Sequence, residues 1–97
     1  MITHIVLFKF KESTTSEQKE AVIFNLRSLK DEIPGIIDLK AGLNVSDKHK
    51  GFEIGLSILF NDKKALEQYG PHPKHQNVVT HLKDNGLLDM IIFDLLE

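Results

Sequence analysis

The residue types that could do chemistry gather between residues 69 and 75, where Tyr69, His72 and His75 flank two prolines. A helix beginning near Pro73 would put His75 on its inward apolar arc, so the imidazole is expected to point into the core. Unpaired N–H groups and the helix dipole disfavour a positive charge in a first turn, which favours a neutral ring. The sequence therefore predicts His75 as a general base, with the Tyr69 hydroxyl orienting a carbonyl or a developing enolate.

Structural roles explain the same residue types as well. A buried histidine in a first turn often only packs or bonds the backbone, and Tyr69 can be a core aromatic with its hydroxyl at the rim. His72 is expected to cap the helix, while His4 either lines the same cavity or finds a backbone partner. His81 falls to the side of the inward arc and is expected on the surface.

The sequence indicates no metal site and no cofactor. His72 and His75 have i,i+3 spacing, but two histidines without an inward carboxylate do not make a zinc site. No glycine loop follows a strand in a phosphate-binding pattern, and no serine sits in a nucleophile elbow. Cysteine is absent, which excludes disulfides and thiolate chemistry.

Charge and hydropathy patterning exclude further classes of partner. Lys plus Arg number 12 against 14 Asp plus Glu, with no long run of one sign, so neither nucleic acid nor anionic lipid is an expected partner. The apolar C-terminal stretch is interrupted by Asp89 and Asp94, and the N-terminus lacks the features of a signal peptide. We expect a cytoplasmic protein without a membrane segment.

The elements that must position these residues can be read from hydrophobic periodicity. Period-two alternation predicts strands at residues 36–45 and 52–60. A β-branched and aromatic run at residues 2–10 and an almost wholly apolar run at 87–96 predict two further strands, each with apolar residues on both faces. A capping box, either Thr14 with Glu17 or Thr15 with Gln18, predicts a helix that ends at Pro34-Gly35. A second helical region, capped by Asn61 or Asp62, is expected to break at Gly70-Pro71, restart at Pro73 and end at Asn85-Gly86.

This order is β-α-β-β-α-β, which predicts one α+β domain over residues 1–97 with a ferredoxin-like antiparallel sheet. Two helices cover only one face of such a sheet. The other face still carries Ile5 and Leu7, and the last strand offers apolar residues to both sides. An apolar patch of that size is uncommon on a monomer, so we expect the chain to pair with a second copy, sheet against sheet, as a dimeric α/β barrel.

Several segments together resemble the stress-responsive dimeric α/β-barrel (Dabb) family, nearly from end to end. They are the opening His4-Ile-Val-Leu-Phe-Lys-Phe-Lys11, the Pro34-Gly35 turn, Gly51-Phe52, Tyr69 with His72-Pro73-Lys74-His75, and the closing Ile91-Ile-Phe-Asp94. The resemblance implies a homodimer. It includes plant members that cyclise linear polyketides of the olivetolic acid type by aldol condensation, with a catalytic tyrosine and histidine that match Tyr69 and His75.

The resemblance also implies a ligand pocket near these two residues, and its departures limit what can be carried over. The expected pocket residues are His4, Val6, Phe8, Ile54, Leu56, His72 and Val79. Ile54 stands where the cyclases have a pocket histidine, and Leu26 where they have a pocket tyrosine, so their substrate is not carried over to this chain. Most members of the family have no assigned reaction and are described through stress response.

Three functions therefore remain open. The first is a homodimer that holds a small, mostly apolar ligand between sheet and helices without an assigned reaction. The second is a cyclase or isomerase in which His75 removes a proton next to a carbonyl that Tyr69 holds. The third is a purely structural dimer module. A cavity of about 300 Å³ shared by Tyr69 and His75 would favour a ligand.

Overall fold

The fold is built on strand β1 (Ile2–Phe10), whose side chains alternate between two environments. Every second residue, from Ile2 through Val6 to Phe10, is buried beneath the helices, whereas Ile5 and Leu7 on the other face are half-buried. The alternation follows from the pleat of a strand, which turns successive side chains to opposite faces. The predicted division of this strand into two apolar faces is therefore confirmed.

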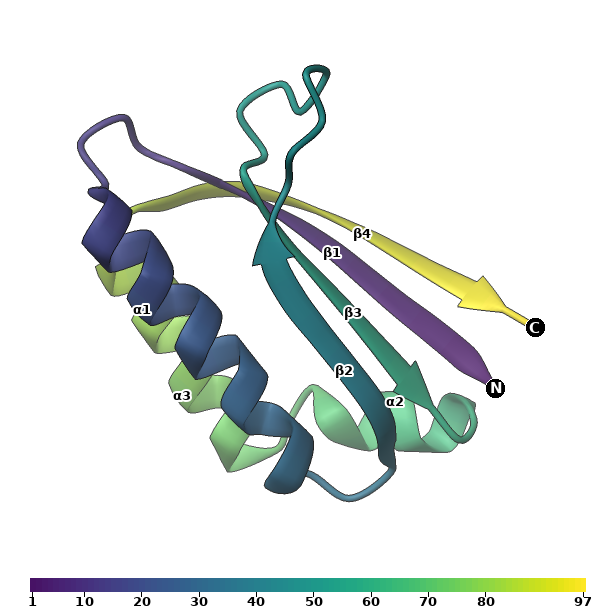
Figure 1. Cartoon of the computed structure of the whole chain (residues 1–97). Helices are drawn as coiled ribbons and strands as arrows, with labels where there is room; N and C mark the ends of the chain where they lie inside the picture. The colour runs from purple at the N-terminus through teal and green to yellow at the C-terminus, as the bar shows by residue number, and fades with distance from the viewer.

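The structure is a computed structural model that describes all residues, 1–97, as a four-stranded antiparallel sheet with helices on one face (Figure 1). The remaining elements are α1 (Ser16–Arg27), a 3₁₀ turn η1 (Ser28–Asp31), β2 (Ile36–Leu43), β3 (Ile54–Phe60), α2 (Lys63–Tyr69), α3 (Pro73–Asp84) and β4 (Leu87–Leu96). The strands lie in the order β2-β3-β1-β4. The predicted ferredoxin-like α+β fold is confirmed.

Helix α1 begins at one of the two predicted capping boxes. Thr15 is the N-cap, and its hydroxyl accepts a hydrogen bond from the Gln18 N–H while the Gln18 side chain bonds the Thr15 N–H. Thr14 instead is buried and donates to the Asn85 carbonyl at 2.7 Å. The prediction that the helix runs to Pro34-Gly35 was wrong, because the chain tightens into η1 after Arg27 and buries Leu29 there.

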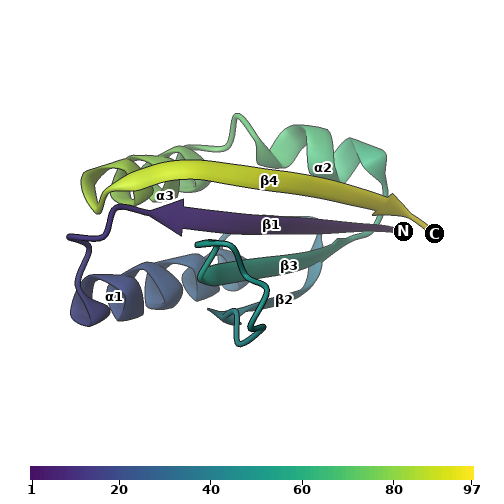
Figure 2. The same cartoon turned by 90° about the horizontal axis from the view of Figure 1, so that it is seen from above.

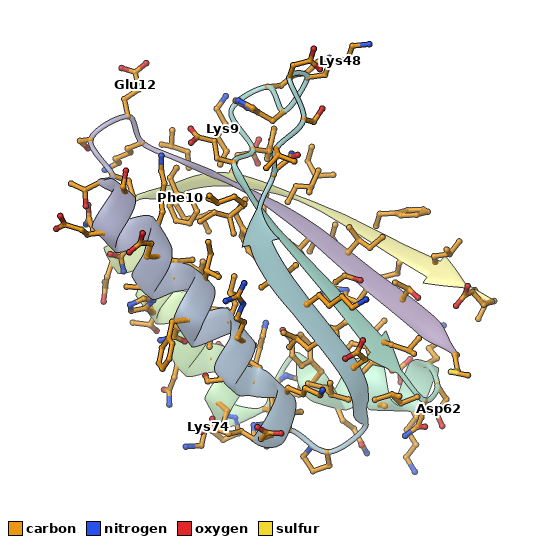
Figure 3. All side chains as sticks on the ribbon, viewed as in Figure 1. Lys9, Phe10, Glu12, Lys48, Asp62 and Lys74 are labelled. Atoms are coloured by element: carbon orange, nitrogen blue, oxygen red, sulfur yellow. The ribbon has the colours of Figure 1, made fainter.

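Strands β2 and β3 form the predicted hairpin but are shorter than expected at the loop. A bulge at Ile37 shifts the register, and the ladder ends at the pair of Leu43 with Ile54. The intervening loop projects beyond the sheet, with Lys48 at its tip (Figure 3). Gly51 adopts φ 86° within it, a conformation that favours glycine.

The second helical region is broken in two, as predicted. Asp62 caps α2 by accepting from the Ala65 N–H at 2.9 Å. His72 caps α3 by accepting from the Lys74 N–H at 3.1 Å, and Pro73 occupies the first helical position. No helix of the chain is long and apolar enough to cross a lipid bilayer.

The core lies between the sheet and the helices, and it bears on the predictions that Ile54 lines the ligand pocket and that His81 lies on the surface. Ile54 is fully buried on β3. His81 is not a surface residue: it is half-buried, and its Nδ1 is buried without a hydrogen-bond partner. The helical wheel considered only the arc that faces the sheet, whereas α3 also contacts α1.

Replacing Ile54 by alanine tests the position of this residue in the packed core. We expect Ile54→Ala to lower the free energy of unfolding by about 2 to 5 kcal/mol, because it leaves a cavity among buried side chains. Urea denaturation measures the loss. Val45→Ala, at a residue that is 93% exposed, serves as the control and should change stability by less than about 0.5 kcal/mol. A similar effect of both substitutions would contradict the packing described here.

Candidate functional site

A cavity of about 280 Å³ separates β1 and β4 from the helices α2 and α3. These two helices follow one another along the edge of the sheet formed by β4. Helix α1 lies on the same face of the sheet, toward the other edge, formed by β2 and β3 (Figure 2). The walls are mainly aliphatic and aromatic, with side chains such as Val6, Phe8 and Leu56 from the sheet and Val79 and Leu82 from α3. The volume lies just below the range of drug-sized sites, so the cavity suits a small ligand.

His75 lies at the start of α3 and lines this cavity. Its Nδ1 lies 2.8 Å from the Gly70 carbonyl oxygen, which also accepts a hydrogen bond from Gln76 Nε2 at 2.8 Å. A carbonyl can only accept, so Nδ1 must carry a proton. In the neutral ring, Nε2 therefore keeps its lone pair and can accept a proton.

The surroundings of His75 favour that neutral form. Burial lowers the pKa of the imidazole below its usual 6.5, whereas the bond to Gly70 works in the opposite direction. The proximity of His4 and His72 lowers the pKa further. A base that is neutral near pH 7 is ready to take a proton.

Tyr69, the last residue of α2, lies between the two histidines of the cavity. Its ring centroid is 4.3 Å from that of His75 and 5.7 Å from that of His4. The hydrogen bonds of this cluster run from His4 to Asp94 and from His75 to Gly70, and neither uses the Tyr69 hydroxyl. Burial raises the pKa of the phenol above its usual 10.0, so the hydroxyl stays protonated and can donate.

His4 is held by a partner that sequence reasoning missed. Its Nδ1 lies 2.5 Å from a carboxylate oxygen of Asp94, directly opposite on β4. Because the carboxylate accepts, it fixes the ring orientation and leaves Nε2 as the free nitrogen. Asp94 is separated from His4 by 90 positions in the chain, and only the strand register brings them together.

The structure brings most of the predicted pocket residues together, but not all of them. Those that line the cavity are His4, Val6, Phe8, Leu56, Tyr69, His75 and Val79. Ile54 is fully buried and does not line the cavity, and His72 turns its Nδ1 to the backbone of its own helix. Leu26, the position that the family resemblance aligns with a pocket tyrosine, does line the cavity.

Chemically, the cluster can donate one hydrogen bond and accept one proton beside an apolar chamber. That combination suits a carbonyl compound, since a phenol can stabilise the carbonyl oxygen while an imidazole approaches the adjacent carbon. No group of three or more His, Asp or Glu side chains comes together in a way that could hold a metal ion.

The protonation of His75 can be followed directly. The folded protein binds this proton less readily than the unfolded chain, so the contribution of the ring to stability is fully present above pH 6.5. It is lost as the pH falls through the lower, folded-state value. NMR titration of the ring should give a pKa below 6.5. In His75→Gln, the free energy of unfolding measured by urea denaturation should fall less on acidification than in the wild type. A pKa above about 7 would contradict the described environment, because it would require a charged partner.

Comparison with known proteins shows the family of this chain. A family model described as the stress responsive A/B barrel domain matches residues 2–96. Olivetolic acid cyclase of Cannabis sativa is 29% identical over 76 residues, which are 76% of this chain and 75% of that protein.

Solved structures share the fold at lower sequence identity. A protein of Arabidopsis thaliana, At3g17210, superposes with a TM-score of 0.87 at 24% identity, over 100% of this chain and 95% of that one. A dimeric ferredoxin-like protein of Bacteroides fragilis gives 0.80 at 24% identity, over 97% and 93%. The hydroxynitrile lyase of Passiflora edulis gives 0.83 at 15% identity, over 97% and 90%. The match to the family model spans nearly every residue, and the chain belongs to the stress responsive A/B barrel domain family.

Proposed function

We propose that residues 1–97 form one domain that pairs with a second copy and binds a small, mostly apolar carbonyl compound in the cavity. The observation that carries this proposal is the composition of the cavity wall. Most of the wall is apolar, and Tyr69 and His75 converge at one end of it. An apolar chamber with a few convergent polar groups is the usual form of a small-molecule site.

The proposed pairing rests on the face of the sheet that no helix covers. On this face β4 exposes Ile91, Phe93 and Leu95 by 41 to 55%, next to Ile5 and Leu7 of β1. Apolar surface of this kind usually marks an interface. Structural neighbours from Bacteroides fragilis and two other organisms are described as dimeric.

The open face also has a shape that a second copy can fill. Gly42, Gly55 and Ser57 leave a shallow groove over β2 and β3, beside the bulky side chains of β1 and β4. In a two-fold pair, both partners use the same surface. The side chains of β1 and β4 of one copy can therefore pack into the groove over β2 and β3 of the other.

A second candidate function is removal of a proton next to the bound carbonyl, in a cyclase or isomerase type of reaction. The specific observation in its favour is the hydrogen bond from His75 Nδ1 to Gly70, which leaves Nε2 as a base beside the Tyr69 ring. Relatives named as a cyclase and as a hydroxynitrile lyase support an enzymatic role. A purely structural dimer module is the remaining reading.

The pairing can be tested with one charge. The wild-type chain at micromolar concentration should scatter light as a dimer, with a mass twice 11.0 kDa. Leu7→Asp should give monomer or unfolded protein, since burying an unpaired carboxylate costs several kcal/mol. Asn77→Asp, on the exposed side of α3, places the same charge elsewhere and should remain dimeric. A wild-type mass near 11.0 kDa would contradict the proposal.

Binding and proton removal can be separated with one ketone, 2-nonanone. We expect 2-nonanone to shift NMR signals of cavity residues. If the protein is an enzyme, the α-protons of the ketone should also exchange faster in D₂O than they do without the protein. His75→Ala should slow that exchange by about 10²- to 10⁴-fold with the fold intact, and Tyr69→Phe should slow it less. Binding without exchange leaves the ligand-binding role and removes the catalytic one. No binding, together with a large loss of stability in His75→Ala, would support the structural module.

A further inference from the structure

The cavity has two chemically different ends. Tyr69 and His75 lie at one end, beside the pair of His4 with Asp94. Lys83 lines the other end, near the close of α3. The walls between them are apolar.

The distance between these two ends can be estimated independently along α3 and along β1. Along α3, Lys83 lies eight positions after His75, which corresponds to about 12 Å of helix. Along β1, His4 and Phe8 line the cavity four residues apart, which corresponds to about 13 Å of strand. The two elements run in the same direction, because the Lys11 N–H at the end of β1 bonds the Gly86 carbonyl after α3, at 3.0 Å. The cavity is therefore an elongated chamber rather than a compact one.

Lys83 is the one permanently charged side chain among the residues that line the cavity. Three lysines, Lys19, Lys30 and Lys74, form ion pairs with carboxylates, and the fourth close pair joins His4 to Asp94, so Lys83 has no acidic partner. Its side chain is exposed, which places its charge at the mouth of the chamber. No carboxylate lines the cavity to neutralise it.

We infer that the ligand is a linear oxo acid, with its carbonyl at Tyr69 and His75 and an anionic carboxylate at Lys83. This inference rests on the proposed ligand-binding function and narrows it to a substrate class. The apolar middle of the chamber accepts the hydrocarbon chain, and the two polar ends fix its direction. Lys83 is then a specificity-determining residue, because it distinguishes the acid from a neutral ester of the same shape.

A cation in the last turn of a helix also has a structural role. Lys83 interacts favourably with the negative end of the dipole of α3, as any lysine there would. That role affects the stability of the helix and does not distinguish a charged ligand from an uncharged one. The discriminating measurement is therefore the ratio of two affinities and not the effect of a substitution on stability.

The experiment compares 9-oxodecanoate with its methyl ester by titration calorimetry at low ionic strength. Wild-type protein should bind the acid about three- to five-fold more tightly than the ester, as expected for one partly exposed ion pair. Lys83→Met keeps the apolar stem and should remove the preference by weakening only the acid. Lys64→Met, on the exposed surface of α2 and away from the cavity, should keep the wild-type ratio. Added salt should reduce the preference in the wild type.

The possible results separate this inference from the function on which it rests. Equal affinities for acid and ester in the wild type, or an unchanged preference in Lys83→Met, would overturn the oxo acid inference and leave carbonyl binding standing. Failure of both compounds to bind at millimolar concentration would overturn the ligand-binding proposal and this inference with it. An acid preference that disappears only in Lys83→Met is the result that supports it.

Discussion

Strand β1 serves two surfaces at once, because successive side chains along a strand point to opposite faces of the sheet. His4, Val6 and Phe8 form the floor of the cavity, while Ile5 and Leu7 lie on the open face. A slip of one residue in its pairing would exchange the two sets and abolish both surfaces. The register with β3 and β4 on either side is therefore the constraint on which the cavity and the open face both depend.

The break between α2 and α3 brings Tyr69 and His75 together at the cavity. Had the helical region continued without interruption, the Gly70 carbonyl would have accepted only from its own helix. The break leaves that carbonyl to hold His75, and it sets Tyr69 at the end of one helix against the start of the next. Gly70 has no heavy atom within 4 Å of where a side chain would begin, so the glycine is not required there by crowding. Pro73 and the cap made by His72 fix the start of α3 after the break.

Local signals in the sequence were sufficient for most of the fold. Alternation and apolar runs located the strands, and the candidate caps located two helix starts to within one residue, at Thr14 or Thr15 and at Asn61 or Asp62. These features depend on neighbours within a few residues, and the structure uses Thr15 and Asp62. The lining of the cavity was harder to predict. Period two places Ile54 and Leu56 on the same face of β3, yet only Leu56 lines the cavity, whereas Ile54 is fully buried in the core.

Long-range pairing was beyond the reach of sequence patterns. Asp94 looked like an interruption in an apolar strand, and nothing local indicated that the register would set it against His4. The burial of His81 Nδ1 was missed for a related reason. The hydrophobic periodicity of α3 indicates its apolar face but not its contacts with α1.

Strand β4 has a consequence for how the protein responds to heat. It is an edge strand of ten residues, and Met90 through Phe93 form an uninterrupted apolar run between Asp89 and Asp94. Once the chain unfolds, such a segment readily pairs with the same segment of other chains, and the flanking aspartates act as its gatekeepers. Where such aggregation outpaces refolding, survival on heating is governed by the rate of unfolding and depends on scan rate. Under that condition, the resistance of this protein to temperature is best expressed as a half-life.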